Sequence, residues 1–254
     1  MTFDPVGFWG LPTATVDWCE QNYAVSPYLG ECFNTVSSLA MVAAGSLGLA
    51  RGRAEADSRV GIAYGLLALV GLGSMAFHAT LRFEFQLLDE LPMLYLVTWM
   101  AYLLVETGPS RRLGWWFPAL LVTYVVIATL SAALTRGRVQ FAVFHLTFGF
   151  LELSCLVRVA WLALQPENGR VRRIFWLGLG CYGLGVGLWF VDLKACPLLS
   201  VTLPSVGIPN PQLHAWWHVL VSVGFFLLLQ VVSADRWRRR SEVPAITRRA
   251  ELAG

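Results

Sequence analysis

The chain has 254 residues, of which 56% are apolar and only 14% are charged, and its formal net charge is +3. Soluble globular domains carry about 25% charged residues, so this composition excludes a disordered chain, a nucleic-acid binder built on a basic surface and an ordinary cytosolic enzyme. It is typical of a polytopic membrane protein, in which the few polar residues need an explanation.

Seven apolar segments are long enough to cross a bilayer, since a transmembrane helix needs roughly 20 mainly apolar residues. Charged residues or turn-forming Gly and Pro separate the segments. A transmembrane β-barrel would show shorter segments of about ten alternating residues, and the sequence has no such pattern. We therefore predict an all-α polytopic membrane protein, a bundle of seven transmembrane helices. The predicted spans are residues 32–51, 59–81, 87–106, 113–134, 139–164, 172–191 and 212–233.

The segments around these spans predict the domain organisation and the orientation. Residues 1–31 precede the bundle, residues 32–233 form it, and residues 234–254 form a basic tail. The loops on the N-terminal side carry four Lys/Arg, whereas the other side carries fourteen, tail included. Cytosolic loops are enriched in Lys and Arg, so we expect a cytosolic C-terminus and a lumenal or extracytosolic N-terminus. This suits an ER or Golgi membrane in a eukaryote and the inner membrane in a bacterium. Residues 1–31 contain no Lys or Arg and no early apolar run, so we expect no cleavable signal peptide there.

Histidines and an acidic residue fall at one depth of the predicted bundle. His214 and His218 share one face of the seventh span, because residues i and i+4 are neighbours on a helix. Ser74 and His78 share a face of the second span for the same reason. Since successive spans alternate in direction, these residues and Asp89 all lie in the outer halves of their spans. Ionisable groups inside a membrane are costly and by default mark a functional site, so we predict a site here.

Three neutral imidazoles with one open position are typical of catalytic zinc, which lowers the pKa of its bound water to about 7. Asp89 would then act as general base, and Ser74 would donate a hydrogen bond to the developing oxyanion. Two haem-ligating histidines are the main alternative, but they leave Ser74 and Asp89 without a role. We expect His145, alone on an apolar helix, to be a hydrogen-bonded interior residue. No role is assigned to Glu152 or Arg158.

Oxygen donors recur in the N-terminal segment at Asp17, Glu20, Asn22 and Glu31. Carboxylate and amide oxygens suit Ca²⁺, which takes six to eight oxygen ligands, some of them backbone carbonyls. The spacing is not that of an EF-hand. An acidic, solvated loop is therefore the alternative interpretation of these residues.

The five cysteines divide between two environments. Cys155 and Cys181 fall within spans, where they act as small apolar residues. Cys19, Cys32 and Cys196 fall on the outer side, where oxidation is permitted. A Cys19–Cys196 disulfide would tie the acidic segment to the loop before the seventh span, but spacing alone does not determine the pairing.

Five spaced motifs run along the chain: Asp17-Trp-Cys-Glu-Gln-Asn-Tyr23, Glu31-Cys-Phe-Asn-Thr35, Gly73-Ser-Met-Ala-Phe-His78-Ala-Thr-Leu81, Gln86-Leu-Leu-Asp-Glu-Leu-Pro-Met93 and His214-Ala-Trp-Trp-His218. They resemble those of the alkaline ceramidase family, which belongs to a superfamily of seven-helix membrane hydrolases that also includes the adiponectin receptors. The resemblance extends from residue 8 to about residue 230, in matching order. It implies an amidase that hydrolyses ceramide to sphingosine and a fatty acid.

The resemblance also implies which residues act. The family's catalytic serine and aspartate fall on Ser74 and Asp89. A family disulfide would join Cys19 to Cys196. The zinc ligands fall on three histidines, His78, His214 and His218. A Ca²⁺ site would be formed by Asp17, Trp18 through its carbonyl, Glu20, Asn22 and Glu31.

Two positions depart from the family pattern, since Ser38 stands where Asn is frequent and Phe83 where Tyr is usual. We expect neither side chain to contact a ligand. Two other classes of function compete with ceramide hydrolysis: hydrolysis of another lipid, as in phospholipid or GPI remodelling, and a non-catalytic lipid receptor or transporter. In each case the partner is a membrane lipid and not a nucleic acid.

Overall fold

A computed structural model describes residues 6–55, 58–107, 112–165 and 169–242. Within these residues seven helices are long and apolar enough to cross a membrane, and no β-strand is present, which confirms the predicted fold class. The helices are α1 (Cys32–Ser37), α2 (Leu39–Glu55), α3 (Ser58–Thr80), α4 (Phe83–Val105), α5 (Trp116–Leu134), α6 (Gly137–Ala163), α7 (Gly169–Lys194), α8 (Leu203–Ser205) and α9 (Leu213–Glu242), with a π-helical turn at Leu198–Thr202.

The first span is interrupted, and the last is longer than predicted. α1 ends at Ser37 and α2 begins at Leu39, so one membrane crossing consists of two helices. α9 continues beyond residue 233, because Asp235 forms ion pairs with Arg238 and Arg239 three and four residues later. The first part of the predicted basic tail is thus helical. Residues 243–254, with Arg248 and Arg249, lie outside the described residues, as does Arg111 of the predicted cytosolic loops.

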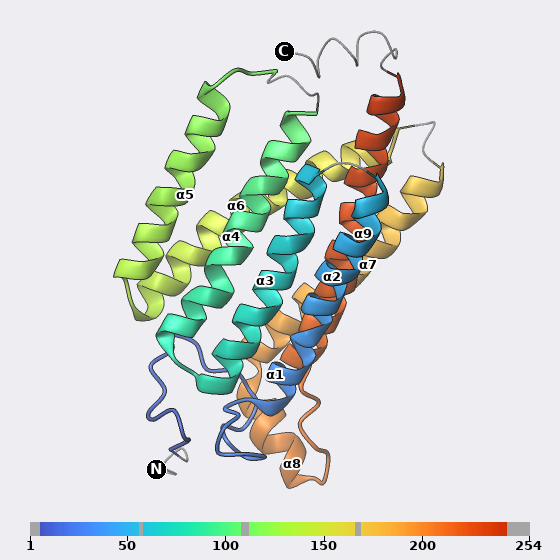
Figure 1. Cartoon of the computed structure of the whole chain (residues 1–254). Helices are drawn as coiled ribbons and strands as arrows, with labels where there is room; N and C mark the ends of the chain where they lie inside the picture. Colours follow the sequence, from blue (N-terminus) through green and yellow to red (C-terminus); the bar gives the residue numbers. More distant parts are fainter. Residues whose placement is uncertain (1–5, 56–57, 108–111, 166–168, 243–254) are drawn as a thin grey trace.

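The helices surround a core in which α3 packs between α2 and α4, and α9 packs on α7 and α2. α5 lies at the edge of the bundle in Figure 1 and makes its main contacts with α4 and α6. Glycines bring α7 close to α9, as a Cβ on Gly178 would lie 3.0 Å from the Cβ of Leu227. Gly185 packs on α9 in the same way, whereas Gly180 and Gly183 face open space. Only some of the α7 glycines therefore contribute to the close packing of α7 on α9.

The residues of the predicted site gather at one end of the bundle. α3 ends there, while α4 and α9 begin there, and the N-terminal segment folds over this end (Figure 1). The N–H groups of Gly30 and Glu31 donate hydrogen bonds to the carbonyls of Ala79 and His78, each 2.8 Å long. The N-terminal segment therefore satisfies carbonyls that the last turn of α3 leaves without helical partners.

Candidate metal centre and lipid cavity

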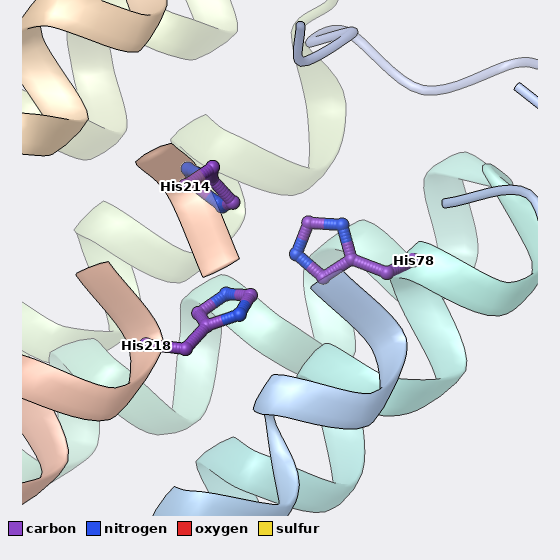
Figure 2. Close-up of side chains that lie close together, drawn as sticks. All are labelled: His78, His214 and His218. Atoms are coloured by element: carbon purple, nitrogen blue, oxygen red, sulfur yellow. The ribbon is translucent and has the colours of Figure 1, made fainter. Parts of the chain in front are cut away.

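Three buried histidines converge between α3 and α9. Candidate ligand atoms of His78, His214 and His218 all lie within 4.8 Å of one another. Figure 2 shows the three rings turned toward a common centre, His78 from one helix and the other two from successive turns of α9. Within the described part of the chain, these residues are the one group of three or more His, Cys, Asp or Glu whose ligand atoms approach so closely.

Hydrogen bonds leave nitrogens of this cluster available for a cation. Nδ1 of His78 lies 2.5 Å from the Glu31 carboxylate, and Nδ1 of His218 lies 2.8 Å from the Ser37 hydroxyl. Nε2 of His78 and Nδ1 of His214 are buried without a hydrogen-bond partner. Buried polar atoms are normally paired, and a second hydrogen bond on the outer ring nitrogen is the usual arrangement for a metal-binding histidine. The donor set therefore fits zinc.

The predicted catalytic side chains lie beside these histidines. Ser74 is one helical turn before His78, and its hydroxyl is 3.4 Å from Nε2 of His218. The same hydroxyl is hydrogen-bonded to the carboxylate of Asp89 on α4. The structure thus brings all five residues together from three helices, as their positions along the spans predicted.

A close contact between α3 and α4 sets the distance between Ser74 and Asp89. A Cβ added to Gly73 would lie 1.9 Å from the carbonyl oxygen of Leu88 and 2.9 Å from the nitrogen of Asp89. Pro92 lies in α4 four residues after Leu88 and has no N–H, so the helix offers this carbonyl no i+4 donor. Gly73 packs against the exposed carbonyl, and its neighbour Ser74 thereby reaches Asp89.

Ser38 of the first span, next to Ser37, also lies beside the cluster. Ser38 lies where α1 and α2 meet, with its hydroxyl 3.0 Å from that of Ser74 and 3.5 Å from Nδ1 of His218. The expectation that Ser38 contacts no ligand is therefore wrong, because the break between the two helices turns it toward α9.

Phe83, the second departure from the family pattern, lies at the start of α4. Its ring centroid is 3.5 Å from the Arg136 guanidinium.

The predicted calcium ligands lie in the N-terminal segment that precedes α1. Asn22 donates a hydrogen bond to Asp17 (3.0 Å), and the backbone N–H of Trp18 donates one to Glu31 (3.1 Å). Glu20 accepts hydrogen bonds from the first turn of α1, at the N–H groups of Phe33 and Asn34. The segment thus holds these side chains together around the beginning of α1, where the positive end of the helix dipole favours carboxylates.

Burial raises the pKa of both Glu20 and Glu31 to about 7, although hydrogen bonds from backbone and side-chain N–H groups oppose this shift. Glu31 is entirely buried, and Oδ1 of Asn22 is buried without a hydrogen-bond partner. Carboxylates in such surroundings are stabilised by a cation, so the donor set fits a hard ion such as Ca²⁺. Their ligand atoms are not as tightly gathered as those of the histidines.

A disulfide and a hydrogen bond hold the N-terminal segment beside the histidine cluster. A disulfide joins Cys19 to Cys196, as expected, and the Cys19 N–H donates a 3.2 Å hydrogen bond to Asp192 of α7. The ring of Trp18 stacks on that of His214, with centroids 3.7 Å apart. Asp192 was not singled out from the sequence, although a carboxylate directly at the end of an apolar span was the signal that could have identified it.

A largely apolar cavity of about 190 Å³ adjoins the centre. Asp89 and His214 line one end of it, and Glu152 lines the other. His145 contacts the carbonyl of Phe141 through Nδ1 (2.7 Å), as expected of an interior histidine, and it also lines the cavity. Glu152 accepts a hydrogen bond from Tyr182. A pocket lined mainly by apolar side chains, with a few polar groups, is typical of a small-molecule binding site.

Known proteins share the sequence pattern over most of the chain. The family model described as Ceramidase matches residues 10–247. Alkaline ceramidase 3 of Mus musculus is 33% identical over 229 residues, covering 88% of this chain and 84% of its own length. Alkaline ceramidase YPC1 of Saccharomyces cerevisiae is 30% identical, covering 91% and 79%. Alkaline ceramidase of Arabidopsis thaliana is 29% identical, covering 94% and 90%.

Proposed function

Because the chain belongs to the ceramidase family, we propose that it is a zinc-dependent intramembrane amidase that hydrolyses ceramide to a long-chain base and a free fatty acid. The observation that carries this proposal is the convergence of three buried histidines beside Ser74 and Asp89. The names of the relatives support ceramide as the substrate. The apolar cavity next to Asp89 suits a lipid with long hydrocarbon chains.

Zinc would be held by the imidazoles of His78, His214 and His218, whose nitrogens form a His₃ set with buried, unpartnered atoms. When bound there, zinc polarises the amide carbonyl and lowers the pKa of a bound water to about 7. Glu31 and the Ser37 hydroxyl orient the rings of His78 and His218 through their Nδ1 atoms.

Asp89 and Ser74 would carry the proton transfer and the charge stabilisation. Asp89 accepts a proton from the attacking water as the water oxygen bonds to the amide carbon. Ser74 donates a hydrogen bond to the carbonyl oxygen as negative charge develops there. Asp89 then returns the proton to the amide nitrogen while the C–N bond breaks, which releases a neutral amine and a carboxylic acid.

Calcium would bind at Asp17, the carbonyl of Trp18, Glu20, Asn22 and Glu31, where two buried carboxylates and an unpaired amide oxygen support a hard cation. Glu31 reaches both this segment and His78. The calcium segment would face the lumenal or extracytosolic side, and the basic end of α9 would face the cytosol, in accordance with the distribution of Lys and Arg.

The test is mass spectrometry of the products that the purified protein forms from ceramide, phosphatidylcholine and a GPI-anchored lipid in parallel, with bound metals measured on the same preparation. We expect long-chain base and fatty acid from ceramide only, with about one zinc per chain. His78→Ala should lose both zinc and hydrolysis, and Asp89→Ala should lose hydrolysis. Cleavage of a different lipid, or near-full activity of either variant, would overturn the proposal.

A further inference from the structure

Three residues are shared by two separate cavities of the protein. Glu152, Tyr182 and Phe225 line the end of the large cavity that lies farthest from the metal centre. The same three residues line a second, smaller cavity of about 20 Å³. They therefore stand between the two spaces.

The second cavity lies deeper in the bundle than the first. α4, α6 and α9 all run away from the metal centre along the chain (Figure 1). On these helices the second cavity is lined by residues up to two turns beyond the three shared residues, and its lining is almost entirely apolar. These lining residues include Met100, Cys155, Val159, Leu228 and Leu229.

The three shared residues contact one another across three helices. The hydroxyl of Tyr182 on α7 donates a hydrogen bond to the carboxylate of Glu152 on α6. The ring of Tyr182 meets that of Phe225 on α9 edge-on, with centroids 5.6 Å apart. A Cβ on Gly224 would lie only 2.8 Å from the backbone nitrogen of Tyr182. The close approach of α7 to α9 therefore holds the two rings in place.

A hydrogen-bonded polar pair in apolar surroundings opposes the passage of a hydrocarbon chain. A chain that enters the second cavity must displace the Tyr182 ring and separate its hydroxyl from Glu152. Separating them leaves two buried polar groups unpaired, which is energetically unfavourable. Among the described residues that line the second cavity, Tyr182 is the hydrogen-bond partner of Glu152, and the others are almost all apolar.

We propose that Glu152, Tyr182 and Phe225 form a partition that sets the maximum length of the hydrocarbon chain accepted by the cavity. This inference rests on the proposed lipid hydrolysis at the metal centre. The step from Phe225 to Leu229 advances about 6 Å along α9, at about 1.5 Å per residue. An extended chain advances about 1.2 Å per bond, by analogy with polypeptide, so removal of the partition adds room for about five carbons.

The test compares Phe225→Ala, which removes one of the two rings between the cavities and gives the Tyr182 ring space to move aside, with Phe226→Ala. The Phe226 ring lies 5.9 Å from that of Tyr64 and lines neither cavity, so it offers a matched change at the next position. Two series of ceramide pairs are used: in one the two ceramides differ only in acyl length, and in the other only in base length. The two members of a pair compete in the same mixed micelles. The amounts of the two products give the ratio of kcat/KM for the longer ceramide to that for the shorter one.

We expect Phe225→Ala to raise the long-to-short ratio at least about 10-fold in one of the two series, since a few methylenes in an apolar pocket give discrimination of this size. The Phe226→Ala ratio should match that of the native protein. A double variant, Glu152→Leu with Tyr182→Phe, replaces the polar pair with apolar side chains and should raise the long-to-short ratio in the same series. Equal ratios in all variants would overturn the partition.

A second measurement separates this inference from the proposed function. Thermal stabilisation by saturated fatty acids of 8 to 24 carbons reports the cavity length without any hydrolysis. A longer optimum in Phe225→Ala than in Phe226→Ala supports the partition even if no ceramide is cleaved. An unchanged optimum contradicts the partition even if ceramide hydrolysis is confirmed.

Discussion

The carboxylate of Glu31 lies 2.5 Å from Nδ1 of His78, and both side chains are entirely buried. This contact joins the acidic N-terminal segment to the histidine cluster. Because a carboxylate at Nδ1 orients the imidazole and increases its basicity, it favours metal binding through Nε2. Glu31 therefore positions His78 in the proposed zinc site and is also a proposed calcium ligand.

Replacement Glu31→Gln should weaken zinc binding about 10- to 100-fold, as is usual when the outer partner of a ligating histidine is changed. The measurement is zinc retained by the purified protein against increasing chelator. Glu84→Gln is the control, because Glu84 is an exposed residue that pairs with Arg82. Native zinc retention in Glu31→Gln would show that the contact does not support the metal centre.

Asp89→Asn should reduce ceramide hydrolysis at least about 100-fold, the usual contribution of a general base, while zinc content stays at the native level. The reason is that Asp89 lies beside the histidines without belonging to the His₃ set. Activity and metal content are measured on the same preparation. Loss of zinc in this variant would instead make Asp89 a metal ligand.

Gly73→Ala should reduce both thermal stability and activity. The new Cβ would lie 1.9 Å from the Leu88 carbonyl, so α3 and α4 must separate and Ser74 must move away from Asp89. Gly65→Ala on the same helix is the control, because its Cβ would meet nothing within 4 Å. Ala is the better helix former by about 1 kcal/mol, so Gly65→Ala should raise the melting temperature. Similar effects of the two changes would contradict the close-contact explanation.

Cys19→Ser should lower the free energy of unfolding by about 2–4 kcal/mol and loosen the N-terminal segment. The disulfide closes a loop between residues 177 positions apart, and its loss releases the segment that carries Trp18 from α7. Thermal unfolding and protease sensitivity measure the effect. Cys181→Ser removes a free cysteine and should leave both properties unchanged. Equal effects of the two variants would show that the Cys19–Cys196 disulfide does not stabilise the N-terminal segment.

Calcium should stabilise the protein more at pH 8 than at pH 6. Burial raises the pKa of Glu20 from 4.5 to about 7, so between these values the cation-free folded protein holds a proton that the unfolded chain has lost. Its stability therefore falls as the pH rises through this window. Calcium must displace that proton below pH 7 but not above it.

The measurement for this prediction is the calcium-induced shift of melting temperature at pH 6, 7 and 8. Glu20→Gln removes one of the two carboxyl groups whose pKa burial raises to about 7 and should reduce the increase between pH 6 and pH 8, while Glu31 still titrates in this window. A shift of the same size at pH 6 and pH 8 in the native protein would contradict a calcium site that includes Glu20.

The sequence by itself determined the seven spans and which polar residues of these spans lie at one depth. Apolar runs of membrane length are a local property, and each run was long enough to be recognised without its neighbours. His214 and His218 share a face because of helical periodicity alone. The alternating direction of the spans then brought His78 and Asp89 to the same depth.

Only the tertiary structure decided which side chains touch. Ser38 meets Ser74 because the first span breaks between α1 and α2, and Gly178 packs on α9 while Gly180 does not. Periodicity tells which residues share a face, but the rotation and crossing of the helices decide what that face meets. The low charge of the chain predicted a membrane protein, whereas the contacts of Tyr182 with Glu152 and Phe225 depend on three helices lying side by side.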